Sequence, residues 1–254
     1  MFVIKLLKKH LIDSQIYVSL AGTLLAVFFI LEQDTFRYPT ILLVFITYFS
    51  GYLYTKYQYH RFFYKILFIN VICGIISAVL IYHNHHEIRL VKWLVIVFLG
   101  LLYNSKFLEN YIRKIPLVKV FYVGLVWALV NSWLSFPTFN FPIFVISFLF
   151  VTALVLPFDI RDFRNDKVIT FPKIIGVQNS KYLAYLLVFL SVLVAIFALK
   201  PAFAVSFYIT AIFTNLLIYF SDENRSDCYY SFGVESMSLL PFLVLQIGFY
   251  FEIF

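Results

Sequence analysis

The sequence predicts an all-α, polytopic membrane protein with about nine transmembrane helices in a single bundle around a central cavity. Hydrophobic residues make up 63% of the 254 residues, and charged residues only 13%, against about a quarter in a soluble domain. Apolar stretches of the roughly 20 residues that a membrane span needs also recur along the whole chain. Because spans and short connections use nearly all of the sequence, we expect one integral-membrane domain over residues 1–254.

The chain opens with a basic segment and continues with the spans. Residues 1–12 place Lys5, Lys8 and Lys9 among apolar residues, which favours a short helix at the membrane interface. A signal peptide is the poorer interpretation, since no small-residue cleavage site follows. The predicted spans are residues 14–31, 40–57, 62–82, 89–105, 116–134, 141–158, 180–199, 201–219 and 237–254.

The basic residues predict an orientation. If the N-terminus is cytoplasmic, only Arg37, Arg89, Lys92 and Lys200 of the 20 Lys and Arg residues fall on the far side. Since cytoplasmic loops are enriched in Lys and Arg, this asymmetry predicts an integral protein of the cell inner membrane with a cytoplasmic N-terminus. The net charge of +7 then faces anionic lipid headgroups and phosphorylated substrates, so nucleic-acid binding is the poorer interpretation.

The chemically most informative stretch is residues 156–176, which read LPFDIRDFRNDKVITFPKIIG. It follows an uncharged run and places Asp159, Asp162 and Asp166 at spacings of three and four. A helix continued past the run would carry all three carboxylates on one face. Because carboxylates repel one another unless a cation lies among them, and oxygen-only clusters favour hard ions, the stretch predicts a Mg²⁺ ion that bridges to a phosphate.

Two further stretches on the same predicted face have two interpretations each. Tyrosines crowd residues 47–64, which is typical of an aromatic belt at a membrane interface or of a pocket lining. Residues 101–119 carry Tyr103, Lys106, Arg113 and Lys119. The positive-inside bias alone explains the basic residues of this stretch. In the alternative interpretation, the stretch contacts a diphosphate.

The remaining polar stretches have solvated loops as their simplest interpretation. Residues 83–87 read HNHHE; they lie opposite the aspartates, and three histidines in a loop fix no metal geometry. Residues 221–237 are acidic and aromatic, and form either a connector or a rim over the aspartate site. The two cysteines, Cys73 and Cys228, form neither a disulfide framework nor a metal-ligand spacing.

The aspartate stretch resembles a known family. DIRDFRNDK followed by TFPKIIG, residues 159–167 and 170–176, is similar to the second aspartate-rich motif of the UbiA-type intramembrane prenyltransferases. The resemblance implies a helical bundle whose cavity opens to the cytoplasm and to lipid. It also implies a transferase in which Mg²⁺ on two aspartate motifs ionises an isoprenyl diphosphate, and the prenyl cation is captured by a lipophilic acceptor.

Carried over to this sequence, the resemblance makes Asp159, Asp162 and Asp166 the catalytic metal ligands. Lys173 takes the place of a basic residue that helps to hold the diphosphate. Tyr103 and Lys106 approximate a tyrosine–lysine pair at the end of the fourth span. Lys119 and Arg113 complete the expected substrate contacts.

The first aspartate motif of that family has no counterpart here. Residues 47–58 offer Thr47, Ser50, Thr55 and Gln58 instead of carboxylates, and uncharged oxygens bind Mg²⁺ far more weakly. Two alternatives to an enzyme therefore stay open. One is a non-catalytic lipid-binding or scaffolding protein, in which the aspartates pair with Arg161, Arg164 or neighbouring lysines. The other is a transporter, which the lack of an ionisable residue near the midpoint of any predicted span disfavours.

Overall fold

Helices make up nearly all of the regular structure. The computed structural model describes residues 15–58, 60–83, 87–103, 117–164 and 169–252, and contains no strand in these ranges. The helices are α2 (Ile16–Glu32), α3 (Tyr38–Tyr57), α4 (Phe63–His83), α5 (Glu87–Tyr103), α7 (Val118–Leu129), α8 (Phe141–Arg161), α9 (Phe171–Ile175), α10 (Val177–Ala198), α11 (Pro201–Phe220) and α12 (Glu235–Tyr250), with π-helical turns η2 (Val130–Leu134) and η3 (Tyr229–Val234). The prediction of an all-α fold is confirmed.

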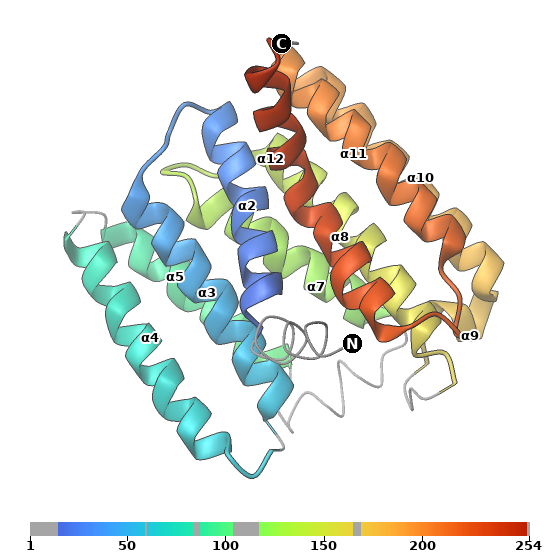
Figure 1. The fold of residues 1–254 in the computed structure, drawn as a ribbon. Helices are drawn as coiled ribbons and strands as arrows, with labels where there is room; N and C mark the ends of the chain where they lie inside the picture. The colour runs from blue at the N-terminus through green and yellow to red at the C-terminus, as the bar shows by residue number, and fades with distance from the viewer. Residues whose placement is uncertain (1–14, 59, 84–86, 104–116, 165–168, 253–254) are drawn as a thin grey trace.

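The long helices pack as a closed ring (Figure 1). From α2 through α3, α4, α5, α7, α8, α10 and α11 to α12, each helix contacts the next, and α12 packs back on α2. The ring has two ends that matter below. We call the aspartate end the one where α3, α5 and α8 finish and α7 begins; at the opposite end α2 and η2 finish and α3, α5 and α8 begin.

The helices coincide with the predicted spans. Every predicted span overlaps a helix of the described chain, and five helices there are long and apolar enough to cross a membrane: Phe63–His83, Phe141–Arg161, Val177–Ala198, Pro201–Phe220 and Tyr229–Tyr250. The last of them starts eight residues earlier than predicted, at Tyr229 rather than at residue 237. Burial of Tyr230 and Val234 explains the difference, because these side chains hold the preceding turn against the bundle. The interfacial helix predicted for residues 1–12 lies outside the described residues.

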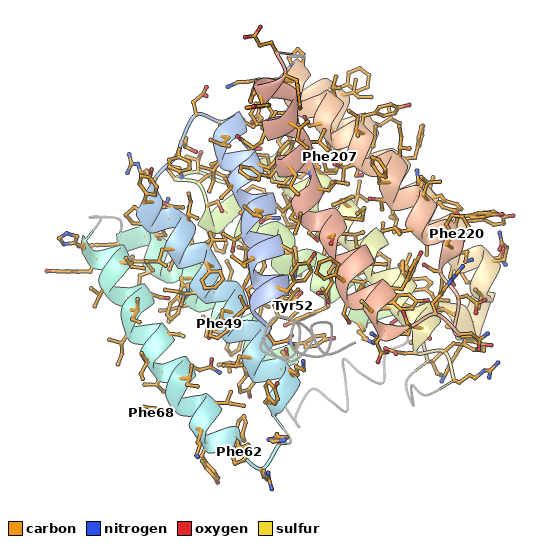
Figure 2. The ribbon with its side chains drawn as sticks, viewed as in Figure 1. Phe49, Tyr52, Phe62, Phe68, Phe207 and Phe220 are labelled. Carbon is orange, nitrogen blue, oxygen red and sulfur yellow. The ribbon has the colours of Figure 1, made fainter. Side chains whose placement is uncertain are left out.

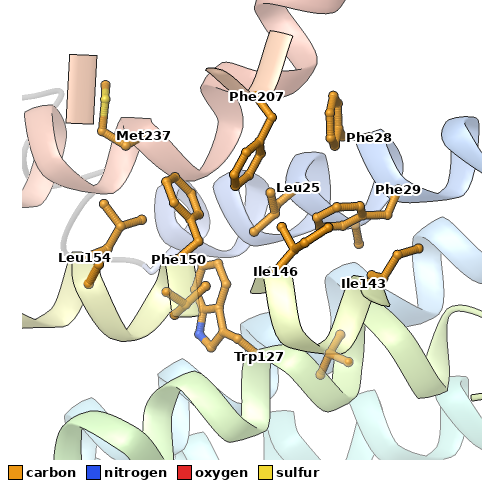
Figure 3. Close-up of a cluster of buried hydrophobic side chains, with 14 of the residues drawn as sticks. Leu25, Phe28, Phe29, Trp127, Ile143, Ile146, Phe150, Leu154, Phe207 and Met237 are labelled. Carbon is orange, nitrogen blue, oxygen red and sulfur yellow. The ribbon is translucent and has the colours of Figure 1, made fainter. Parts of the chain in front are cut away.

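A cluster of large apolar side chains fills one side of the ring. Phe150 of α8 lies against Phe207 of α11, with ring centroids 5.0 Å apart, and Leu25 of α2 lies beside them (Figure 3). By contrast, α4 and the turn before it keep large side chains on the outside of the bundle, such as Phe68 of the helix and Phe62 of the turn (Figure 2). An exposed apolar face of this kind suits contact with lipid.

Candidate functional site

A cavity of about 340 Å³ lies between α3, α4, α5 and α7. Most of its lining is apolar or aromatic, with contributions from Ile46, Tyr48, Tyr52, Leu67, Trp93, Ile96, Val97, Leu101, Tyr122, Val123, Val126, Trp127 and Val130. Such a space suits the apolar part of a lipid-like molecule, because concave apolar sites bury most of a ligand's surface.

Hydrogen bonds fix the aromatic rings of this cavity. The Tyr48 hydroxyl donates to Asn131 Oδ1 at 3.0 Å, and Trp127 Nε1 donates to the Tyr52 hydroxyl at 2.9 Å. Tyr48 and Trp127 also lie with ring centroids 4.8 Å apart. The pocket interpretation of residues 47–64 is confirmed for Tyr48, Tyr52, Tyr54, Ser50 and Thr55, which line the cavity, but not for Lys56 and Gln58, which do not. Tyr64, 83% exposed, fits the aromatic belt.

Two polar atoms of α4 face this cavity without a partner. Asn70 and Ser77 both line it, seven positions apart and hence on one face of the helix. Among the described residues, the buried Asn70 Oδ1 and Ser77 Oγ have no hydrogen-bond partner. Since buried polar atoms are normally paired, they favour a ligand that brings a polar group into the apolar cavity.

The aspartates lie where α8 ends. Asp159, 1% exposed, accepts from Lys119 Nζ at 3.3 Å. Asp162 accepts from Arg161 Nε and Nη2 at 2.8 and 2.9 Å. The expectation of a helix continued through all three aspartates is wrong, because α8 stops at Arg161 and Asp162 is its C-cap. Asp competes with the helical backbone and favours caps and turns, which explains the early stop. Asp166 lies outside the described residues.

The segment after α11 packs on the aspartate end. The Arg161 guanidinium lies over the rings of Phe158 and Tyr230, 5.3 and 5.7 Å from their centroids, and Arg164 forms an ion pair with Glu223. The Tyr230 hydroxyl donates to the Asp222 carbonyl at 2.6 Å. These contacts favour the interpretation of residues 221–237 as a rim over that of a solvated connector.

The rim also holds an ionised carboxylate in the loop before η3. The Asn224 backbone N–H donates to Asp222 Oδ1 at 2.9 Å, and this bond holds the pKa of the Asp222 carboxyl below its usual value. Asp222 is therefore ionised at neutral pH and contributes a negative charge to the rim.

The basic residues predicted to bind substrate lie in different places. Lys119 precedes the cavity-lining Tyr122 and Val123 by three and four positions, so it lies one turn from them on the same face of α7. Tyr103 lines the cavity and stacks on Tyr122 with centroids 5.5 Å apart. The structure thus brings Tyr103, Lys119 and Asp159 to one end of the cavity. Lys173 lies exposed on α9, and Lys106 and Arg113 fall outside the described residues.

Glu235 is a residue of this end that sequence reasoning left in a loop. It is the first residue of α12, and it interacts electrostatically with Arg161, Lys56 and the cavity-lining Tyr52. A signal was available: Val234, Met237 and Pro241 recur at helical spacing, and all three are buried. That pattern indicates a helix beginning before residue 237.

The donor set at this end fits magnesium in part. Within the described ranges, no group of three His, Cys, Asp or Glu side chains is assembled for a metal. Proteins nevertheless bind Mg²⁺ through one or two carboxylates and complete its shell with water and substrate phosphates. Asp159 and Asp162 supply such carboxylates, and their partners Lys119 and Arg161 are cations that suit a phosphate.

Comparisons with known proteins identify the architecture. No family model and no curated protein matches the chain. Three solved structures do. A UbiA homologue from Archaeoglobus fulgidus bound to GPP and Mg²⁺ has a TM-score of 0.64 and 12% identity, and covers 92% of this chain and 96% of its own. An apo UbiA homologue from Aeropyrum pernix K1 gives 0.64 and 11%, with coverages of 94% and 98%. A structure of digeranylgeranylglyceryl phosphate synthase gives 0.61 and 16%, with coverages of 98% and 99%.

Proposed function

From the UbiA-type fold that this chain has, we propose that it is a membrane prenyltransferase. It ionises an isoprenyl diphosphate with Mg²⁺ and transfers the prenyl group to a lipophilic acceptor. The observation that carries the proposal is the position of the Asp159–Lys119 pair, one turn of α7 from an apolar cavity. A neighbour of the same fold is bound to GPP and Mg²⁺, which supports the choice of diphosphate and metal.

We assign the charged residues of the aspartate end to the diphosphate. Asp159 and Asp162 hold Mg²⁺, together with Asp166. When bound, Mg²⁺ neutralises the negative charge that develops on the departing diphosphate. Lys119 and Arg161 exchange their carboxylate partners for phosphate oxygens, a contact that charge-assisted hydrogen bonds favour. Lys173, Lys106 and Arg113 are proposed as further phosphate contacts.

The cavity takes the prenyl chain and the acceptor. Its apolar lining excludes water, which would otherwise capture an allylic cation. The faces of Tyr48, Tyr52 and Trp127 supply rings over which a cation is stabilised. Asn70 and Ser77 orient a polar group of the acceptor.

One observation favours a second candidate, a non-catalytic scaffold of the same fold. Within the aspartate stretch, both described carboxylates are already paired with cations, Asp159 with Lys119 and Asp162 with Arg161. In addition, residues 47–58 contain no carboxylate, so the metal site has only one motif.

Pyrophosphate release separates the two candidates. Purified protein is incubated with geranylgeranyl or farnesyl diphosphate, with Mg²⁺ or with a chelator. An enzyme releases pyrophosphate only with Mg²⁺. Absence of release at every chain length, beside a control enzyme that works, supports the scaffold. Mass spectrometry of copurifying lipids then identifies the acceptor class.

We also propose that the aspartate end faces the cytoplasm of a cell whose inner membrane holds the protein. Cys228, exposed in the loop before η3, and Cys73, buried in α4, allow a direct test. A membrane-impermeant maleimide is expected to label Cys228 in inside-out vesicles and not in intact cells. The Cys228→Ser variant is the control for residual labelling of Cys73. Labelling of intact cells that is lost in Cys228→Ser reverses the proposed orientation.

A further inference from the structure

A second pocket lies at the end of the bundle opposite the aspartates. It measures about 180 Å³ and is lined by Asp34, Thr35, Phe36, Arg37, Thr40, Arg89, Ser135 and Pro137. Two of its lining residues carry guanidinium groups. Since it lies at the other end of the helices from Asp159 and Lys119, it forms no part of the prenyltransferase site proposed above.

The two cations at the start of α5 are both buried, Arg89 at 6% exposed and Lys92 at 5%. Among the residues that the structure describes, neither forms an ion pair with a carboxylate. A buried charge without a counter-charge is costly. Each of them therefore needs an explanation.

Lys92 is explained by the chain itself. Its ammonium donates to the carbonyl oxygens of Trp133, Phe136 and Pro137 at 3.1, 2.9 and 2.8 Å. These carbonyls follow or end η2, where backbone acceptors lack helical partners. All three N–H groups of Lys92 are thus used, and its role is to cap this turn.

Arg89 is only partly explained. Its guanidinium donates to Thr40 Oγ1 at 2.8 Å and to the Ser135 carbonyl at 3.5 Å. A guanidinium has five N–H donors, so most of its capacity is left for the pocket that it lines. Arg37 lies close enough to repel it electrostatically, and an anion between the two would relieve that repulsion.

The acidic residue of the pocket is already neutralised. Asp34 lines the pocket, but its Oδ2 forms an ion pair with Lys200 Nζ at 2.6 Å. The Thr35 and Thr40 hydroxyls add polar groups to the wall. The lining also carries the guanidinium groups of Arg37 and Arg89, so cations outnumber carboxylates in the wall of the pocket.

We propose that this pocket binds a phosphate-class oxyanion between Arg37 and Arg89. A guanidinium matches the geometry of such an anion because its planar fork donates two parallel hydrogen bonds. The anion is either the headgroup phosphate of a membrane lipid or free phosphate. Bound there, it supplies the counter-charge that the described residues do not provide for Arg89.

Two arms of one experiment separate the two sources. In the first, detergent-purified full-length protein is titrated with inorganic phosphate against chloride at equal ionic strength, and the melting temperature is followed. In the second, the protein is offered phosphatidylglycerol or diacylglycerol, which lacks the phosphate, and retained lipid is measured by native mass spectrometry. A response to phosphate identifies free anion; selective retention of phosphatidylglycerol without that response identifies the headgroup.

The variants assign the binding to this pocket. Arg89→Gln and Arg37→Gln are each expected to weaken it about tenfold, the effect of one lost charge-assisted contact. Lys119→Gln, at the aspartate end, is expected to retain it. Should Arg89→Gln not fold, Arg37→Gln carries the test. The proposal is overturned if wild type shows neither response, or if Lys119→Gln abolishes a response that Arg37→Gln retains.

Discussion

Replacing Asp159 by Asn is expected to slow pyrophosphate release by about 100-fold or more, since a metal on the phosphate supplies several kcal/mol of transition-state stabilisation. The substitution keeps the shape of the side chain and removes the charge that holds Mg²⁺. Release from geranylgeranyl diphosphate in a single turnover, at saturating Mg²⁺, measures the chemical step directly.

Stability distinguishes a metal ligand from a structural ion pair. Asp159 is 1% exposed, whereas its partner Lys119 is 30% exposed, so the ammonium regains water when the carboxylate is lost. We therefore expect the free energy of unfolding to change by only about 1 kcal/mol, as for partly exposed pairs. Glu87→Gln, an exposed carboxylate at the opposite end, is the matched control and should leave the rate unchanged. A lowered melting temperature of Asp159→Asn, in a protein whose wild type releases no pyrophosphate, would indicate the scaffold.

The second large effect is expected at Gly124, where α7 and α8 pack closely. A Cβ at this position would collide with Thr152 Oγ1 and lie 3.0 Å from the Phe148 carbonyl oxygen. Small residues allow membrane helices this approach. Gly124→Ala is expected to lower the free energy of unfolding by about 2–3 kcal/mol, as overpacking does, and thermal unfolding in detergent measures it.

Two further variants separate this clash from a general effect of alanine. At Gly100 of α5, an added Cβ would meet nothing within 4 Å, so Gly100→Ala should be neutral or slightly stabilising. Thr152→Ala removes the hydroxyl that collides, and should restore part of the stability lost in Gly124→Ala. Equal effects of Gly124→Ala and Gly100→Ala, with no rescue, would mean that the α7–α8 contact tolerates the methyl group.

The predictions for Asp159 and Gly124 concern the same pair of helices, α7 and α8. Gly124 lies five positions after Lys119 on α7, and Thr152 lies seven positions before Asp159 on α8. Because the Asp159–Lys119 pair spans these two helices, a forced separation at Gly124 also lengthens that pair. We therefore expect Gly124→Ala to slow pyrophosphate release as well as to destabilise the fold.

Local patterns predicted much of this architecture. Apolar stretches of span length placed most of the helices within a few residues, because in a bilayer the backbone must satisfy its own hydrogen bonds. The end of the predicted span at residue 158 placed Asp159 and Asp162 where α8 finishes. The same reasoning failed at the helix end itself, since the stop at Arg161 depends on a cap and not on hydrophobicity.

What the sequence by itself determined is which segments are helical and which carboxylates lie at their ends, since both follow from hydrophobicity and spacing within one stretch. Only the tertiary structure decided that Lys119 pairs with Asp159, that Glu235 joins the aspartate end, and that Arg89 lines a pocket with Arg37. Each of these depends on contacts between residues 40 or more positions apart, and such contacts are set by how the helices close into a ring. Packing in the bundle, rather than any local motif, selects them.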